Sequence, residues 1–271
     1  MTRLSAIGEL GLLAELERRS LIVGVEHDAA QLGGLVVTQD ALVEDVHFRL
    51  DLMTWPELGF RAAAVNLSDL AASGATPIGL LVTLALPPDT DVADVVALYE
   101  GIAEAGVPVV GGDTTAAKEV VVSVTAAGRS ERVPGRAGAR PGDTLVVTGS
   151  LGAAGAAFRA GRYIRPPLRL EEGRALAASA HALCDVSDGL AVDAAHIARR
   201  SGVRVVVDLD AVPLAPGATV DDLGFGEDFE LLAAVPGPAG HAVIGRVEAG
   251  GGVLLLRDGA PYELHGWEHF V

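Results

Sequence analysis

Lysine is almost absent from this chain, because Lys118 is the only one and the other Lys/Arg positions are arginines. The sequence therefore excludes a P-loop lysine and the strand lysine of protein kinases, and it leaves little room for Schiff-base chemistry. Cysteine is equally scarce. With Cys184 alone, the chain can form neither an intramolecular disulfide nor a thiolate cluster, and nothing suggests an oxidising compartment.

Long apolar runs are also missing. No stretch reaches the roughly 18 apolar residues that are needed to span a bilayer. The short apolar patch near the start is broken by Glu9 and Glu15, so it lacks the uninterrupted run of a signal peptide. We expect a cytoplasmic protein.

Positive charge is in deficit. The 271 residues include 20 Lys+Arg against 36 Asp+Glu, a formal charge of −16, with 50% hydrophobic and 21% charged residues. This composition predicts a soluble globular protein of one or two domains. Such an acidic chain is a poor binder of nucleic acid, and it would need metal ions to handle an anionic substrate.

The chain divides into two halves. A segment rich in Gly, Pro and Arg at 129–143 interrupts two apolar regions and resembles an interdomain connection. Alternating strands and helices on both sides indicate an α/β or α+β architecture. The expected helices cover about 5–19, 56–73, 91–105, 151–160, 171–182 and 189–201. The expected strands cover 35–39, 80–86, 107–110, 120–126, 145–148, 204–208, 229–235, 243–247 and 253–257, with a tight turn at 258–259.

Aspartates recur where a strand ends or a helix begins, at Asp28, Asp40, Asp113, Asp185 and Asp188. Each acid alone is most simply a helix cap or a solvated loop carboxylate. As a set they occupy the places where α/β proteins build sites. Carboxylates without a His/Cys cluster favour Mg²⁺ over Zn²⁺.

Asp69 falls near the C-terminal end of an alanine-rich predicted helix. A carboxylate there meets the negative end of the helix dipole, which costs a few tenths of a kcal/mol. Asn66, three residues earlier, shares its face. Either this is a solvent-facing polar spot, or the carboxylate is held inward for a cation.

Two glycine-rich segments follow predicted strands. GlyGlyAspThrThr at 111–115 is either a phosphate cradle of backbone N–H groups or an ordinary tight turn. GlySerLeuGlyAlaAlaGly at 149–155 has GxxGxxG spacing rather than GxGxxG, which favours close helix–strand packing over dinucleotide binding.

Four long motifs carry a family resemblance. They are AlaValAsnLeuSerAspLeuAlaAlaSerGlyAlaThrPro, GlyGlyAspThrThr, AspValSerAspGlyLeu and GlyGluAspPheGluLeu, in that order. The sequence resembles the thiamine-monophosphate kinases of the aminoimidazole-ribonucleotide synthetase-like ATP-binding superfamily. Weaker matches near both ends extend the resemblance over nearly the whole chain. The chain departs from the family pattern at His27, which replaces an acid, and at Gln39, which replaces a hydroxyl residue.

The resemblance implies ATP-dependent phosphorylation of thiamine monophosphate to thiamine diphosphate. It implies a two-domain fold: an N-terminal mixed-sheet domain (1–134) that pairs in a homodimer, and a C-terminal α/β domain (135–271). ATP would lie between the halves. The implied Mg²⁺ ligands are Asp28, Thr38, Asp40, Asp69, Asp113, Asp185 and Asp188, with Asp113, Asp69 and Asp40 as the catalytic set. The implied ATP contacts are Gly112, Asp113, Arg136 and Ser187, and the implied thiamine phosphate contacts are His47, Glu227 and Trp267.

Direct phosphoryl transfer suits a site of this composition. An anionic phosphate acceptor needs no strong general base, so positioning and charge neutralisation carry the rate. Two alternatives remain open at this point. One is another superfamily enzyme that activates a different oxygen. The other is a nucleotide-binding or structural dimer without catalysis, motivated by His27 and Gln39.

Overall fold

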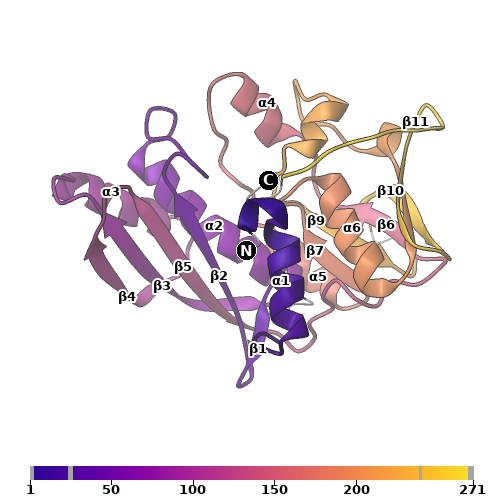
Figure 1. The fold of residues 1–271 in the computed structure, drawn as a ribbon, viewed down its shortest axis with the longest axis horizontal. Helices are drawn as coiled ribbons and strands as arrows, with labels where there is room; N and C mark the ends of the chain where they lie inside the picture. Colours follow the sequence, from indigo (N-terminus) through magenta and orange to yellow (C-terminus); the bar gives the residue numbers. More distant parts are fainter. Residues whose placement is uncertain (1–2, 24–26, 238–239, 268–271) are drawn as a thin grey trace.

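The computed structural model describes residues 3–23, 27–237 and 240–267, and it folds into two halves, each built on its own sheet (Figure 1). The helices are α1 (Gly8–Arg18), α2 (Trp55–Ala72), α3 (Val92–Ala103), α4 (Ala153–Arg159), α5 (Leu170–Ala177) and α6 (Leu190–Ser201). The first sheet contains β1 (Ala30–Leu32), β2 (Leu35–Val43), β3 (Thr76–Leu86), β4 (Val109–Ala116) and β5 (Val121–Arg129). The second contains β6 (Thr144–Val147), β7 (Ala182–Asp185), β8 (Arg204–Asp208), β9 (Leu231–Val235), β10 (Ala242–Glu248), β11 (Gly252–Arg257) and β12 (Ala260–Pro261).

The N-terminal sheet has the order β1-β2-β5-β3-β4, and only the β3–β4 pair is parallel. Side chains of β5 alternate between half-buried and buried, which is the period-two pattern of a sheet with one covered face. Helix α2 packs on that face, where Leu67 and Leu70 join Val122 and Val124 in one core. The opposite face carries no helix in the described part of the chain, and every residue of the edge strand β4 is exposed.

Helix α2 lies between the two halves. Fourteen of its eighteen residues are buried, as expected for a helix that is apolar nearly all round. Its C-terminal residues Ala71 and Ala72 enter a second core with Leu183 of β7 and Leu176 of α5. A capping box between Thr54 and Glu57, with Thr54 N donating to Glu57 Oε2 at 2.8 Å, starts the helix.

Glycine sets how closely α2 and α3 approach. A Cβ added to Gly59 would lie 1.9 Å from the Leu98 carbonyl oxygen, and one added to Gly101 would lie 2.0 Å from that of Pro56. Both distances are far below van der Waals contact, so only glycine permits this crossing.

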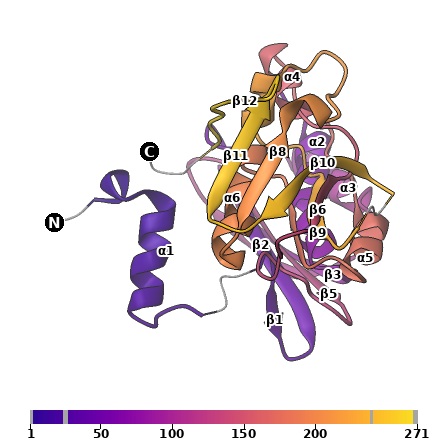
Figure 2. The same cartoon turned by 90° about the vertical axis from the view of Figure 1, so that its right-hand side faces the viewer.

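The seven-stranded C-terminal sheet has the order β12-β11-β8-β10-β6-β9-β7. Helix α6 covers one face through Ala194 and Ile197, while α5 and the end of α2 cover the other. Helix α1 lies at the edge of the molecule (Figure 2), where Glu17 Oε1 is 3.3 Å from Arg200 Nη2 of α6. None of the helices in the described ranges is long and apolar enough to cross a membrane.

The sequence predicted the element order well, with four corrections, the first of which is the short strand β1, which it missed. The expected strand 107–110 is instead the longer β4, so GlyGlyAspThrThr lies inside a strand and not in a tight turn. The sequence missed β7, because the apolar residues before Asp185 follow a helix with no clear break. The expected helix over 5–19 is a 3₁₀ turn at Leu4–Ala6 followed by α1. Asp91 is the N-cap of α3, since its Oδ1 accepts from Ala93 N at 2.8 Å.

Candidate functional site

Three carboxylates meet where the two halves pack together. Asp28 precedes β1, Asp69 lies in the last turn of α2, and Asp185 ends β7. Each offers a carboxylate oxygen, and these three atoms lie within 4.8 Å of one another. The sequence predicted all three acids as metal ligands, and the fold brings them to one point. We call Asp28, Asp69 and Asp185 the carboxylate trio.

Hydroxyl and amide side chains hold the trio in place. Ser68 Oγ donates to Asp185 Oδ2 at 2.6 Å across the two halves, and the Thr38 hydroxyl donates to Asp69. Asn66 Oδ1 accepts from Asp40 N at 3.1 Å, which places Asp40 of β2 beside the trio. Thus the polar residues Asn66, Ser68 and Asp69 of α2 face inward. Of the two alternatives for Asp69, the structure agrees with a carboxylate held inward and not with a solvent-facing polar spot.

Burial makes the trio electrostatically costly. Burial and the neighbouring Asp28 charge raise the pKa of Asp185 to about 7. Burial, followed by the charges of Asp40, Asp185 and Asp28, raises the pKa of Asp69 well above its usual range, and burial also raises the pKa of Asp28 and of Asp40. Carboxylates this close therefore need a cation, or else they hold protons.

A cation fits the donor set. Arg136 from the connection between the sheets forms an ion pair with Asp28, whose side chain is 1% exposed. Apart from Arg136, no described residue donates a side-chain hydrogen bond to the buried Asp28 oxygens. Buried carboxylate oxygens with so few donors, in a set of oxygen ligands, match the coordination that Mg²⁺ takes in proteins.

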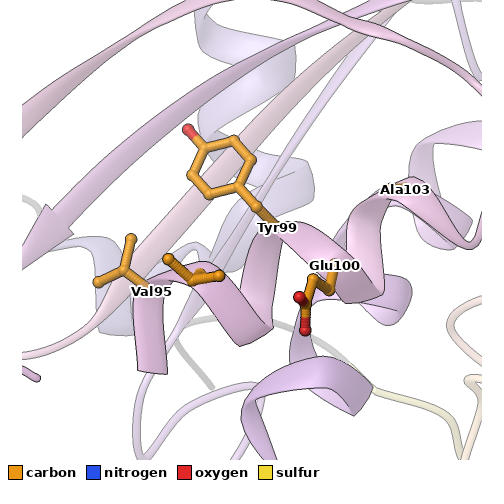
Figure 3. Close-up of a pocket in the computed structure, with 5 residues that line it drawn as sticks. Val95, Tyr99, Glu100 and Ala103 are labelled. Carbon is orange, nitrogen blue, oxygen red and sulfur yellow. The ribbon is translucent and has the colours of Figure 1, made fainter. Parts of the chain in front are cut away.

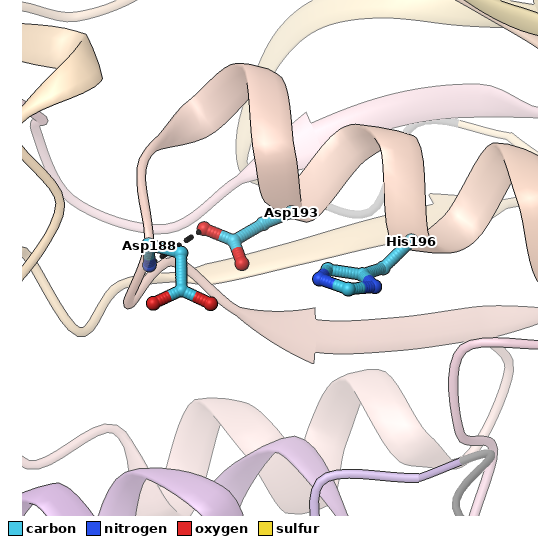
Figure 4. A group of neighbouring side chains, drawn as sticks. All are labelled: Asp188, Asp193 and His196. Atoms are coloured by element: carbon cyan, nitrogen blue, oxygen red, sulfur yellow. Dashed lines mark hydrogen bonds between the residues drawn. The ribbon is translucent and has the colours of Figure 1, made fainter. Parts of the chain in front are cut away.

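A second cluster of side chains that could hold a metal ion lies at the start of α6 (Figure 4). Ligand atoms of Asp188, Asp193 and His196 lie within 4.8 Å of one another, and Asp193 Oδ2 accepts from Asp188 N at 3.2 Å. Burial and the positive charges of Arg136, Arg199 and Arg200 lower the pKa of His196 to about 4, so its imidazole is neutral at pH 7. Asp188 was predicted from sequence, whereas Asp193 and His196 were missed because they look like ordinary residues of an amphipathic helix.

Gly112 and Asp113 do not join the trio within one chain. In the sheet, Asp40 is opposite Val124, Val124 is opposite Val82, and Val82 is opposite Gly112. Three strand spacings separate Asp40 from Gly112, roughly 14 Å. Asp113 is the next residue, and it is exposed on the face of the sheet that carries no helix.

Gly112 also has a structural reason to be glycine. Its φ is +151°, and an added Cβ would lie 1.8 Å from the Val82 carbonyl oxygen. The neighbouring strand therefore excludes a side chain at this position.

The two departures from the family pattern have different positions. Gln39 points to the uncovered face of β2, away from Thr38 and Asp40, and its Nε2 donates to Ser123 Oγ at 3.3 Å. Its side chain therefore does not take the place of the hydroxyl ligand that the family pattern has at this position. His27 lies against Gly135, and its buried Nδ1 has no hydrogen-bond partner among the described residues.

Two of the three predicted substrate residues lie beside one loop of the C-terminal half. Glu227 N donates to Ser187 O at 2.8 Å, and Trp267 N donates to Asp188 O at 2.9 Å. These bonds hold Glu227 and Trp267 beside the loop that follows Asp185. His47 lies on the turn after β2, where its Nδ1 accepts from Val43 N at 3.0 Å.

Arg61 of α2 forms an ion pair with Glu227, and sequence reasoning missed it. The signal was available, because Arg61 is the only basic residue in the apolar stretch 55–72. A shallow apolar hollow of about 390 Å³ along α3 (Figure 3) is lined by Val95, Val96, Tyr99, Glu100 and Ala103. It includes none of the predicted site residues.

Comparisons with known proteins agree with this geometry. Residues 26–130 match the family described as AIR synthase related protein, N-terminal domain, and residues 140–255 match the corresponding C-terminal domain. The thiamine-monophosphate kinase of Aquifex aeolicus is 33% identical, with 99% of this chain and 100% of that protein covered. That of Mycobacterium tuberculosis is 36% identical, covering 98% and 93%. A solved structure of AaThiL complexed with AMPPCP and TMP aligns with a TM-score of 0.90 at 32% identity, covering 99% of each chain. The chain therefore belongs to the thiamine-monophosphate kinase family, with the two-domain fold of AIR synthase related proteins.

Proposed function

We propose that the protein transfers the γ-phosphoryl group of ATP to thiamine monophosphate and forms thiamine diphosphate. The carboxylate trio is the observation that carries the proposal, because three converging buried carboxylates are suited to holding Mg²⁺ against phosphates. Full-length similarity to curated thiamine-monophosphate kinases supports the same reaction.

The reaction is a direct displacement. A phosphate oxygen of thiamine monophosphate forms a bond to the γ-phosphorus, the bond from that phosphorus to the β,γ-bridging oxygen breaks, and ADP leaves. The acceptor oxygen is already anionic, so no residue has to remove a proton first. Mg²⁺, when bound, offsets the negative charge that the phosphates bring together.

The chain's own residues would hold and orient the reactants. Asp28, Asp69 and Asp185 would bind Mg²⁺, with Asp40 and the Thr38 hydroxyl beside them. Arg136 and Ser187 would contact ATP, and His47, Glu227 and Trp267 would contact thiamine monophosphate. Asp188, which lies in the cluster with Asp193 and His196, would supply a further Mg²⁺ ligand.

We further propose that the active form is a homodimer through the uncovered face of the N-terminal sheet. That face and its edge expose Ile78 (45%), Leu81 (47%), Val109 (36%) and Val110 (67%). Exposed apolar side chains gathered on one sheet face are typical of an interface. Gly112 and Asp113 lie on β4 within this surface, so the nucleotide contacts that they would make belong to the partner's site.

Single variants and their mixture test both proposals. Asp69→Asn and Asp113→Asn should each lower turnover at least ~100-fold, about 2.7 kcal/mol in the barrier, in an assay that detects thiamine diphosphate. If each site combines Asp69 of one copy with Asp113 of the other, mixing the two inactive variants with subunit exchange restores one intact site per mixed dimer. A 1:1 mixture should then recover about a quarter of wild-type activity. Absence of thiamine diphosphate from the wild-type reaction would overturn the kinase assignment, and an inactive mixture would overturn the shared site.

His27 and Gln39 favour one second candidate, a dimer that binds nucleotide without turning it over. Gln39 faces away from the trio, and His27 supplies no carboxylate. Calorimetry with an ATP analogue and Mg²⁺, run beside the turnover assay, separates the two functions. Binding without turnover would favour this candidate.

A further inference from the structure

We propose that Arg61 is a positioning residue that fixes the Glu227 carboxylate, and through it the thiamine end of the substrate, relative to the carboxylate trio. The inference rests on the proposed function. It adds a role for a residue of the N-terminal half in a contact that the C-terminal half makes with substrate.

Arg61 occupies an unusual place for a guanidinium. Its side chain is 4% exposed in the middle of α2, and it forms an ion pair with the Glu227 carboxylate through Nη2 and Oε1. Its buried Nε has no hydrogen-bond partner among the residues that the structure describes. The Tyr163 ring centroid lies 5.3 Å from its Cζ, so an aromatic face shields the charge on one side.

Glu227 is constrained from two directions. Its backbone has φ +60°, next to Gly226 at φ +79°, and its N–H donates to Ser187 O at 2.8 Å. A non-glycine residue in the left-handed region persists only when its surroundings fix it. The C-terminal half thus fixes the Glu227 backbone, whereas Arg61 of the N-terminal half fixes its carboxylate.

A buried ion pair of this kind is weak evidence for stability, because desolvation of both charges offsets their attraction. Its use is geometric. Arg61 engages Oε1, and the Glu227 side chain remains 25% exposed. The other carboxylate oxygen can therefore face a heteroaromatic ring that carries a positive charge or an amino group, and the thiamine end has one ring of each kind.

Helix α2 connects this contact to the metal end of the site. Asp69 follows Arg61 by eight residues on the same helix, a rise of about 12 Å. A rigid helix that holds Glu227 at one point and contributes Asp69 to the trio at another sets the distance between ring recognition and phosphoryl transfer. Moving either point would place the acceptor phosphate out of line with ATP.

A double-mutant cycle tests the role. The variants are Arg61→Met, Glu227→Gln and the double variant, with Arg61→Lys as the conservative replacement. Arg165→Met is the matched control, because Arg165 also stacks on an aromatic ring (Phe60, 3.5 Å) and pairs with a glutamate (Glu104, 2.6 Å), but does not contact Glu227. KM and kcat are measured for each substrate, with the melting temperature of every variant as a check on folding.

We expect Arg61→Met to raise KM for thiamine monophosphate at least ~10-fold and to change KM for ATP less than ~2-fold. In the Glu227→Gln background the same change should alter KM for thiamine monophosphate less than ~2-fold, since Arg61 acts through Glu227. Arg61→Lys should recover part of the loss, and it keeps the test valid if Arg61→Met does not fold. Arg165→Met should behave as wild type.

Three results would overturn the inference while the kinase assignment stands. The first is that Arg61→Met changes KM for thiamine monophosphate equally in the wild-type and the Glu227→Gln backgrounds. The second is that Arg61→Met raises KM for ATP as much as KM for thiamine monophosphate. The third is that Arg61→Met has wild-type kinetics. Wild-type protein that forms no thiamine diphosphate would instead overturn the proposed function itself, and this is seen before any variant is compared.

Discussion

Replacing Asp185 with Asn should stabilise the metal-free protein while strongly reducing the stability that it gains from Mg²⁺. Asp185 is 2% exposed, lies against two other carboxylates, and has a pKa of about 7 because burial and the Asp28 charge disfavour its ionised form. The change removes one negative charge from the trio. Its hydrogen bond is retained, since an Asn side-chain oxygen can still accept from Ser68 Oγ, now at 2.6 Å from Asp185 Oδ2.

The direction of the stability change follows from the raised pKa of Asp185. A carboxyl whose pKa rises from 3.8 in the unfolded chain to about 7 in the folded protein binds more protons when folded. Its contribution therefore lowers stability progressively as pH rises from about 4 to 7, and the cost is complete above pH 7. Three pKa units correspond to an upper limit of about 4 kcal/mol. Because Asp28 and Asp69 keep part of the repulsion, we expect a gain of ~1–2 kcal/mol, or ~2–8 °C in melting temperature.

The assay is thermal unfolding at pH 8 in a chelator and in Mg²⁺. Wild-type protein should gain stability on adding Mg²⁺, whereas Asp185→Asn should start higher and gain much less. The matched control is Asp89→Asn, which removes an exposed carboxylate from the turn between β3 and α3 and should change neither melting temperature by more than ~1 °C. A lower melting temperature for Asp185→Asn in chelator, or an undiminished Mg²⁺ response, would refute the reasoning.

Two further predictions concern the scaffold around the site. Asp228 caps the start of α4 by accepting from Gly152 N at 2.6 Å, and burial raises its pKa to about 6. The wild-type protein should therefore lose stability relative to Asp228→Asn as pH rises from about 4 to 6; a melting-temperature difference that does not vary with pH would contradict this. Gly59→Ala should lower the free energy of unfolding by at least ~2 kcal/mol, because its Cβ would lie 1.9 Å from the Leu98 carbonyl oxygen. Urea unfolding measures it, and an unchanged midpoint would show that α2 and α3 separate freely.

Local sequence patterns were sufficient for much of the fold. The alanine-rich stretch before Gly74 predicts α2, and the polar residues Asn66, Ser68 and Asp69 inside it mark the face that reaches the site. The period-two pattern of a strand likewise implies that Thr38 and Asp40 share a face and that Gln39 lies on the other. These features depend on neighbours within one or two turns of chain, so the sequence alone determines them.

Tertiary structure decided which of these residues meet. Asp28, Asp69 and Asp185 converge because α2 lies between the two sheets, an arrangement that no local periodicity encodes. Asp113 has an equally suggestive motif, yet the strand order β1-β2-β5-β3-β4 places it three strands from Asp40 and on the opposite face. The order of strands is set by burial of whole faces over long sequence separations. The sequence by itself therefore determined the ligand chemistry and the family, and only the packing of the two sheets against α2 determined which carboxylates share a site.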